Sequence, residues 1–145
     1  METELAALIA DYWLRVDLRS AEPVDALYTE DGAFRAGALD LHGRAAIKSY
    51  FAKRNREQAA LGRSTRHVQT NLHVQPLGPD RALCRSTVLV FAGTGDLPLQ
   101  TPTPATIADA EDECVRSPDG WRFRSRRLTA VFIGPTVAGF VSPSA

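Results

Sequence analysis

The sequence is poor in the residues that hold small or metal-dependent proteins together. Only two cysteines occur among 145 residues, Cys84 and Cys114, and both fall in segments that predict strands. A chain of this length can bury a core without disulfides, so we expect two buried free thiols. No spacing of Cys and His is typical of a zinc site, and no motif implies a metal, a nucleotide or another cofactor.

Long apolar runs and an excess of either charge are also missing. No apolar segment approaches the ~20 residues needed to span a bilayer, and the first residues, Met-Glu-Thr-Glu, lack the basic and apolar regions of a signal peptide. Acidic and basic residues number 17 each, so no overall field points to nucleic acid, an anionic membrane or an acidic substrate. We therefore expect a cytoplasmic protein.

The first part of the chain predicts three helices. The segments are residues 3–20, a short helix at 24–28 after Pro23, and residues 43–62 with Gly62 as C-cap. The apolar stripe of the first helix consists of Leu5, Leu8, Ile9, Tyr12, Trp13 and Val16. Residues 29–32 predict a turn, and residues 33–35 predict a short strand.

The period of the pattern changes from 3.6 to 2 after residue 62. Residues 65–77, 81–93, 105–116 and 121–134 predict four long strands, joined mostly by Gly/Pro/Asp turns. The exception is the proline-rich connection 93–104, which is too long for a tight hairpin and is typical of a lid or an interface loop. The tail after Gly134 is small and apolar and has no clear pattern.

Helices followed by consecutive strands indicate an α+β fold in a single domain over residues 1–145, with a core at about 3–133 and a tail at 134–145. We expect a curved antiparallel or mixed sheet wrapped around the three N-terminal helices, forming a cone with an internal pocket. Such concavities are the usual place for small-molecule sites.

Asp17 is the first candidate for chemistry. It lies in the last turn of the first predicted helix, where the helix dipole disfavours an anion by ~0.3–1 kcal/mol, and no Lys or Arg lies three or four residues away. A carboxylate in that position needs a partner from elsewhere in the fold. The alternative is a solvated Asp before the turn at Pro23.

His67 opens the first long strand and shares a face with Gln69, Asn71 and His73. A His of ordinary pKa is mostly neutral at pH 7 and can accept a proton, and a carboxylate on its other nitrogen would fix the tautomer. A hydrogen-bonded structural histidine on a solvated face is the alternative.

The chain resembles the SnoaL-like domain of the nuclear-transport-factor-like superfamily over residues 3–133. The resemblance is carried by the order and spacing of Tyr28-Thr-Glu-Asp-Gly32, Leu41-His-Gly-Arg-Ala-Ala-Ile47 and Asp119-Gly-Trp-Arg-Phe123. The superfamily includes scytalone dehydratase, ketosteroid isomerase, polyketide cyclases, a hexachlorocyclohexane dehydrochlorinase and a bile-acid 7α-dehydratase. It also includes the non-catalytic β subunits of ring-hydroxylating dioxygenases, so the fold does not decide the function.

The resemblance is nearest to the branch that uses an Asp in the first helix and a His at the start of the first long strand. It implies catalytic roles for Asp17, His67 and Tyr12. A Lys occupies the Tyr12 position in the dehydrochlorinase, so its absence here argues against halide elimination. Arg126 resembles the pocket arginine of that branch, although the strand register leaves Arg127 open.

The resemblance implies a cofactor-independent lyase or isomerase, dehydratase-like, acting on a small apolar and cyclic molecule such as a polyketide, a steroid or another terpenoid, or an aromatic. The expected substrate-binding residues are Arg126, Asn71, Trp13, Phe34 and Phe51. We expect a homodimer or homotrimer. Two alternatives stay open: a binding or structural protein like the dioxygenase β subunit, and a cyclase that acts mainly by the shape of its pocket.

Overall fold

The computed structural model describes residues 1–100 and 103–135. The elements are α1 (Glu2–Val16), the 3-10 helix η1 (Val24–Leu27), β1 (Tyr28–Ala36), β2 (Leu39–His42), α2 (Arg44–Leu61), β3 (Arg63–Pro76), β4 (Arg81–Thr94), β5 (Thr106–Ser117) and β6 (Gly120–Ile133). The fold is α+β, as expected. The predicted tail at 134–145 lies almost wholly outside the described residues, as does part of the 93–104 connection.

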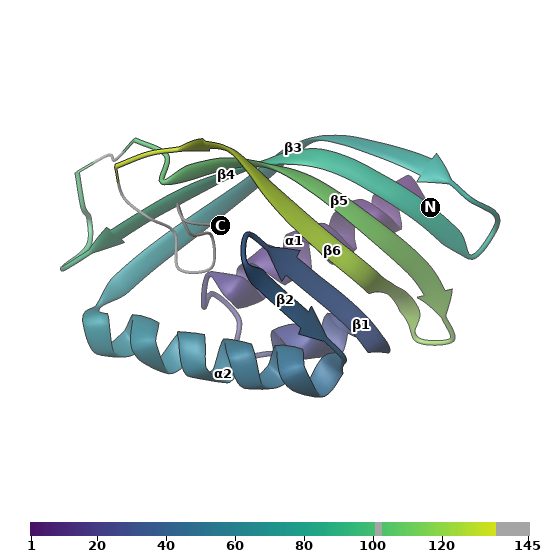
Figure 1. Cartoon of the computed structure of the whole chain (residues 1–145), viewed down its shortest axis with the longest axis horizontal. Coiled ribbons are helices and arrows are strands. Elements are labelled where there is room, and N and C mark those ends of the chain that lie inside the picture. Colours follow the sequence, from purple (N-terminus) through teal and green to yellow (C-terminus); the bar gives the residue numbers. More distant parts are fainter. Residues whose placement is uncertain (101–102, 136–145) are drawn as a thin grey trace.

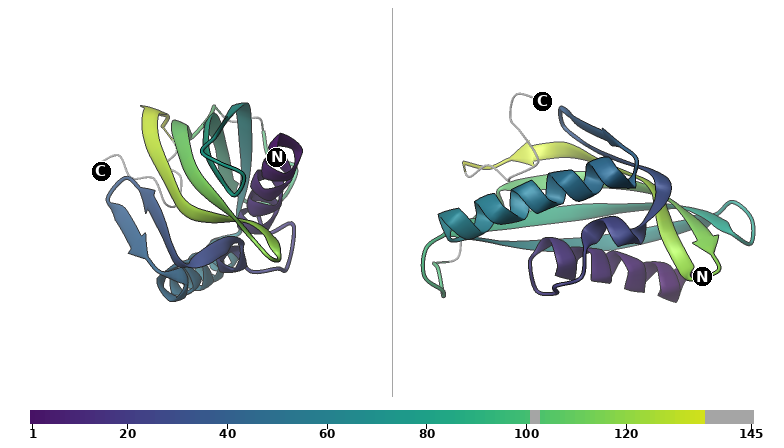
Figure 2. Two further views of the ribbon diagram at one scale, coloured as in Figure 1. Left: turned by 90° about the vertical axis from the view of Figure 1, so that its right-hand side faces the viewer. Right: turned by 90° about the horizontal axis from the view of Figure 1, so that it is seen from below.

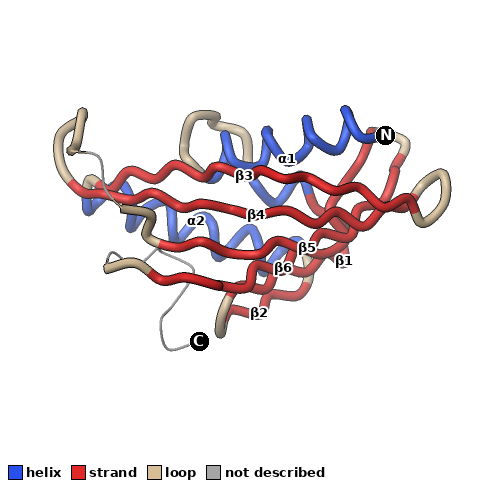
Figure 3. The backbone as a smooth tube through the Cα atoms, turned by 90° about the horizontal axis from the view of Figure 1, so that it is seen from above, coloured by secondary structure: helices blue, strands red, loops and turns tan. Residues whose placement is uncertain are grey.

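One mixed sheet of six strands organises the molecule. Its order is β2-β1-β6-β5-β4-β3, in which only the β1–β6 pair is parallel. The sheet curves, and both α-helices lie on its concave side (Figures 1 and 2). Strand β3 forms one edge, and α1 runs along it (Figure 3). The core fills the space between the sheet and the helices.

Helix α1 forms where the apolar stripe predicts it, but it ends at Val16 rather than near residue 20. Asp17 is its C-cap, and Leu18 takes the left-handed conformation with φ of 58°. The backbone N–H of Arg19 then donates to the Leu14 carbonyl at 2.8 Å, which closes the helix. Asp17 therefore projects from the end of the helix and not from its exposed surface.

One prediction for the second segment is confirmed in part, and another is wrong. The expected short helix at 24–28 is a 3-10 helix, Val24–Leu27, so two α-helices lie among the described residues. The expected turn at residues 29–32 belongs to β1, which carries a bulge between Tyr28 and Ala33. Gly32 sits in that bulge, where a Cβ atom would come within 2.9 Å of the Tyr28 Cβ. β-Bulges use turn-forming residues inside a strand, which explains the error.

The four long strands match their predicted ranges to within two residues. The alternation on β4 directs Ala82, Cys84, Ser86, Val88, Val90 and Ala92 into the core. Both cysteines are buried free thiols, as expected. Among the described residues, no helix is long and apolar enough to cross a membrane.

Candidate active site

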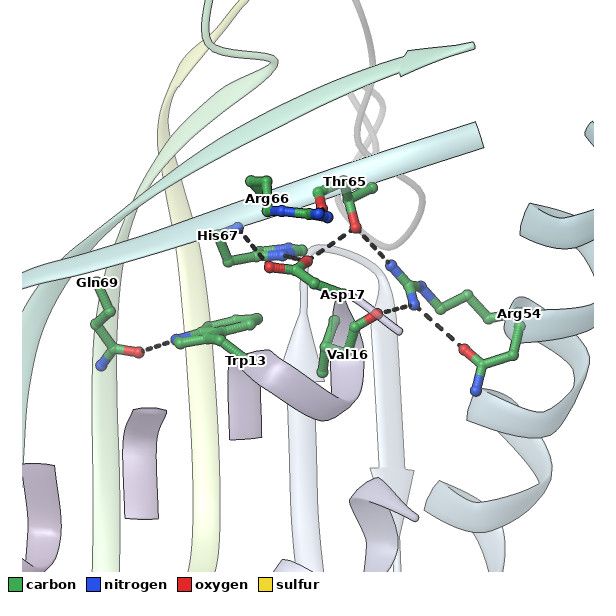
Figure 4. Close-up of polar contacts among 9 residues, drawn as sticks. Trp13, Val16, Asp17, Arg54, Thr65, Arg66, His67 and Gln69 are labelled. Atoms are coloured by element: carbon green, nitrogen blue, oxygen red, sulfur yellow. Dashed lines mark hydrogen bonds and ion pairs between the residues drawn. The ribbon is translucent and has the colours of Figure 1, made fainter. Parts of the chain in front are cut away.

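The structure brings Asp17 and His67 into contact. Asp17 leaves the end of α1, and His67 lies on β3 facing it (Figure 4). The Asp17 Oδ1 atom is 2.6 Å from the His67 ring nitrogen Nδ1, and Asp17 Oδ2 accepts a hydrogen bond from the His67 backbone N–H at 2.9 Å. Both side chains are buried, with 0% exposure for His67 and 4% for Asp17.

Two further side chains hold the Asp17 carboxylate in place. The Thr65 hydroxyl donates to Asp17 Oδ1 at 2.9 Å. Arg54 of α2 is buried, donates to the Val16 carbonyl at 2.6 Å and reaches the Thr65 hydroxyl at 3.4 Å. Arg54 thus satisfies a carbonyl at the C-terminal end of α1 and connects that end to β3. Three donors therefore fix the orientation of the Asp17 carboxylate: the Thr65 hydroxyl, the His67 backbone N–H and the His67 ring.

Trp13 covers the imidazole. Its ring stacks on His67 with centroids 4.2 Å apart and an interplanar angle of 6°. The indole N–H donates to Gln69 Oε1 at 2.5 Å, and Gln69 donates to the Ser86 hydroxyl at 2.5 Å. Trp13, one of the expected substrate-binding residues, therefore lies directly against the His67 ring.

Burial is the main influence on the His67 pKa and lowers it. The Asp17 carboxylate raises that pKa through its hydrogen bond and its charge, while Arg54 and Arg126 lower it. The net pKa lies below the ordinary value of 6.5, so the imidazole is neutral at neutral pH. A neutral ring whose Nδ1–H points at a carboxylate keeps Nε2 as its basic nitrogen.

Arg126, rather than Arg127, points into the protein. Its side chain is fully buried, and it forms two hydrogen bonds with Asp112, from Nε at 2.8 Å and from Nη2 at 3.0 Å. Nη2 also donates to Gln69 Oε1 at 2.9 Å. Burial alone lowers the Arg126 pKa, but Asp112 and the nearby tyrosines raise it, and the net pKa is raised. Arg127 is exposed on the other face.

The Arg126 guanidinium lies against aromatic rings. Its central carbon is 4.3 Å from the centroid of Tyr12, 4.5 Å from that of Phe123 and 5.0 Å from that of Trp13. Its buried Nη1 atom forms no hydrogen bond with any residue that the structure describes. A buried guanidinium with one donor to spare can stabilise an oxyanion.

Tyr12 is in the core, next to this group. Its hydroxyl lies 3.1 Å from the Tyr28 hydroxyl, and burial raises the Tyr12 pKa, so the phenol keeps its proton. Phe34 and Phe51 are also in the core, stacked on each other with centroids 5.9 Å apart. None of these three residues lines the cavities described below.

Asn71 does not lie where the sequence predicted. A bulge between Thr70 and His73 interrupts the alternation of β3, and Asn71 sits in it with φ of 57°, exposed to solvent. After the bulge, Leu72 and Val74 pack against the core instead of the polar residues. The prediction of one continuous polar face from His67 to His73 is therefore wrong, because an extra residue reverses the faces.

A groove of about 690 Å³ runs between α1 and β3 and includes Trp13, His67, Asp17 and Gln69 in its lining. The rest of the lining is mainly apolar: Ala6, Ile9, Ala10, Leu14, Val68 and Leu72, with Arg19 and Arg66. A second cavity of about 370 Å³ lies between the described part of the 93–104 connection and the strands β3 and β4, at the start of β3 and the end of β4. A third, of about 260 Å³, adjoins Asp17.

Three functional candidates were missed by the sequence reasoning. Asp112 could have been found, because it is the one carboxylate in an alternating series of small inward residues from Thr106 to Cys114. Thr65 and Arg54 carried no signal, since their roles depend on how α2 packs on β3. Among the described residues, no group of three or more His, Cys, Asp or Glu side chains could hold a metal ion.

Comparisons with known proteins place the chain in a family. Residues 1–127 match the SnoaL-like domain. No curated protein sequence gives a match. A protein of Novosphingobium aromaticivorans, provisionally named a scytalone dehydratase, is similar in structure with a TM-score of 0.80 and 20% identity, covering 98% of this chain and 91% of its own.

Two more solved structures are similar. ActVI-ORFA of Streptomyces coelicolor has a TM-score of 0.78 and 24% identity, over 92% of this chain and 97% of its own. An NTF2-like protein with a cystatin-like fold from Novosphingobium aromaticivorans has a TM-score of 0.72 and 26% identity, over 92% of this chain and 84% of its own. Fold and sequence agree: the chain belongs to the SnoaL-like family.

Proposed function

We propose that the protein is a cofactor-independent lyase or isomerase of the dehydratase type, in which His67 acts as a general base oriented by Asp17. The observation that carries the proposal is the buried 2.6 Å contact between the Asp17 carboxylate and His67 Nδ1. A carboxylate in that position fixes the tautomer and stabilises the imidazolium that forms when Nε2 takes a proton.

The neighbouring groups support proton abstraction next to a carbonyl. Removal of such a proton leaves the electron pair as an enolate, whose oxygen needs a donor or a positive charge. Arg126 supplies the charge, and its Nη1 supplies a donor that no described residue uses. Tyr12, which keeps its proton and pairs with Tyr28, packs its ring on the Arg126 guanidinium, so its proposed role is to hold that group in place.

The substrate that fits this arrangement is an apolar, cyclic small molecule. The groove beside His67 has an apolar lining from Ala6, Ile9, Ala10 and Leu72. His67 and the Trp13 indole that stacks on it both contribute to the lining of this groove. We place the reacting carbon at this end of the groove, in the pocket of a cone formed by the curved sheet and its helices.

Deuterium exchange tests the proposal without knowledge of the physiological substrate. Cyclic ketones such as 2-tetralone are incubated with the protein in deuterium oxide, and loss of the α-proton signal is followed by NMR. Asp17→Asn and His67→Ala should each slow the exchange ~10²–10⁴-fold, the usual contribution of a general base. Exchange no faster than with free imidazole would contradict the base assignment.

The chain offers matched controls. Asp11 is a second carboxylate of α1, paired with Arg15 on the surface, and His73 is a second histidine of β3, exposed beyond the bulge. Asp11→Asn and His73→Ala should leave the exchange rate within about twofold of the wild-type rate. If the controls lose as much activity as the two test variants, the exchange does not depend on the Asp17–His67 pair.

A second candidate, assembly like that of a dioxygenase β subunit, is favoured by the outer face of the sheet. Val68, Leu89, Ile107 and Phe132 are register partners on four adjacent strands, so they form one apolar row. Phe132 is 65% exposed in the single chain. We propose that this row is covered in a homodimer or homotrimer; a monomer by light scattering at all concentrations would contradict it.

A further inference from the structure

An arginine cluster lines the third cavity, beside the Asp17–His67 pair. The cavity, of about 260 Å³, lies where the end of α1 meets the start of β3 and the last turns of α2. Arg19, Arg54, Arg63 and Arg66 line it, and Asp17 is its only carboxylate. The ionised lining therefore carries a net charge of +3.

Two of these four arginines differ from several others in the chain. The Arg15–Asp11, Arg35–Asp40 and Arg81–Glu113 pairs each place an arginine beside a carboxylate. Arg19 and Arg66, in contrast, are exposed and form no ion pair with a described residue. Like charges in one cavity repel each other unless an anion lies between them.

Asp17 balances only one of the four positive charges in this cavity. Its two oxygens already accept three hydrogen bonds, from the Thr65 hydroxyl and from the ring and backbone of His67. Arg54 forms the buried wall of the cavity, since it is only 5% exposed and is held by the Val16 carbonyl. A guanidinium fixed in this way is preorganised for an oxyanion.

The cavity is continuous with the groove beside His67. Both cavities are lined by Asp17, Arg19 and Arg66. The positively charged third cavity therefore opens into the mainly apolar groove. Figure 4 shows Arg54, Thr65, Asp17 and His67 in sequence across this junction. We propose that the cavity binds the oxyanion head, a phosphate or a carboxylate, of a ligand whose apolar body lies in the groove.

That this ligand is the substrate rests on the proposed function. The substrate would then be an amphiphile, with an apolar ring system beside His67 and an anionic group among the arginines of the third cavity. Arg54 is among the charges that lower the His67 pKa, so an anion bound beside Arg54 should raise it. Ligand binding would then strengthen the base at the moment of reaction.

Three ligands with one tail and different heads test the proposal. Octyl phosphate, octanoate and 1-octanol are titrated into the wild-type protein at low salt, with binding followed by calorimetry. Octyl phosphate or octanoate should bind at least tenfold more tightly than octanol, and the advantage should shrink at high salt because the charges are screened. The tighter of the two anions identifies the head group as phosphate or carboxylate.

The double variant Arg19→Gln/Arg66→Gln should remove the advantage of the anions over octanol. Both side chains are exposed, so the fold should tolerate the change. The matched control, Arg56→Gln/Arg124→Gln, removes two exposed arginines that do not line the cavity and should keep the advantage. Equal affinity for octanol and the anions, or equal losses in both double variants, would overturn the proposal.

The binding assay needs no turnover, so it fails or succeeds independently of the exchange test. In the His67→Ala variant, the anion preference should persist while deuterium exchange is lost. As a second readout, inorganic phosphate should shift the NMR titration of His67 to higher pH in the wild type but not in Arg19→Gln/Arg66→Gln. A shift of equal size in both proteins would show that the anion acts elsewhere.

Discussion

Removing the Asp112 carboxylate should destabilise the fold strongly. Arg126 and Asp112 have 0% side-chain exposure and are joined by hydrogen bonds of 2.8 and 3.0 Å. In Asp112→Ala, the Arg126 guanidinium keeps its charge but loses its carboxylate in a site that water does not reach. Breaking a buried pair in this way costs ~3–5 kcal/mol, since one charge stays buried without compensation.

The neighbouring residue provides the control. Glu113 forms an ion pair with Arg81 from the opposite face of β5, at 2.7 Å, with side chains 28% and 52% exposed. Glu113→Ala should lower the free energy of unfolding by only ~0–1 kcal/mol, because solvent screens such pairs. The two variants delete a carboxylate at adjacent positions of one strand. The difference between their losses of unfolding free energy therefore measures the effect of burying the ion pair.

Urea denaturation followed by tryptophan fluorescence measures both values, provided that the m-value stays constant. The double variant Asp112→Leu/Arg126→Met removes both charges and should recover most of the stability, or exceed it by ~1–4 kcal/mol. A loss below about 1 kcal/mol in Asp112→Ala would refute the view that a charged Arg126 depends on Asp112.

Three predictions concern the Asp17–His67 pair and the Thr65 hydroxyl that binds it. Because Asp17 raises the His67 pKa against the effect of burial, Asp17→Asn should lower that pKa further, measured by NMR titration of the ring protons; an unchanged or raised pKa would contradict the contact. The folded pKa is below the unfolded value of ~6.5, so the unfolded chain binds the proton more tightly, and the free energy of unfolding should fall as the pH drops below ~6.5. His67→Gln should reduce this pH dependence. Thr65→Val removes the 2.9 Å hydrogen bond to Asp17 and should cost ~1–3 kcal/mol in unfolding free energy, with a smaller loss of exchange activity than Asp17→Asn; a loss as large would assign Thr65 more than positioning.

Regular periodicity made most of the fold predictable. The apolar stripe of α1 and the alternation of β3 to β6 depend on which face is buried, and that information is local in the sequence. The β1 bulge was not predictable, because Thr29–Gly32 has turn-forming residues and only the pairing with β6 makes it a strand. The end of α1 at Val16 was also missed, since Leu18 is a poor residue for a positive φ.

Bulges also explain which site residues the sequence could identify. On β6, Trp121 and Phe123 face inward, and strict alternation would place Ser125 and Arg127 beside them. A register shift between Glu113 and Cys114 of β5 interrupts the alternation, so Arg126 and Leu128 face inward instead. The resemblance to the SnoaL-like domain pointed to Arg126 but left Arg127 open, and in the structure Arg126 is buried while Arg127 is exposed. The same kind of irregularity moved Asn71 out of the site.

The buried Arg126–Asp112 pair has no structural necessity, because apolar side chains of similar volume fill such space at lower cost. Its position suggests why it is present. Gln69 accepts hydrogen bonds from Arg126 at 2.9 Å and from Trp13 at 2.5 Å, so the pair fixes the indole that stacks on His67. Burial is the main cause of the lowered His67 pKa, and Arg126 lowers that pKa further. A Met–Leu pair would retain the volume but would lose the hydrogen bond to Gln69 and the positive charge beside His67. The stability cost of the ion pair is therefore expected if His67 acts as the base that we propose.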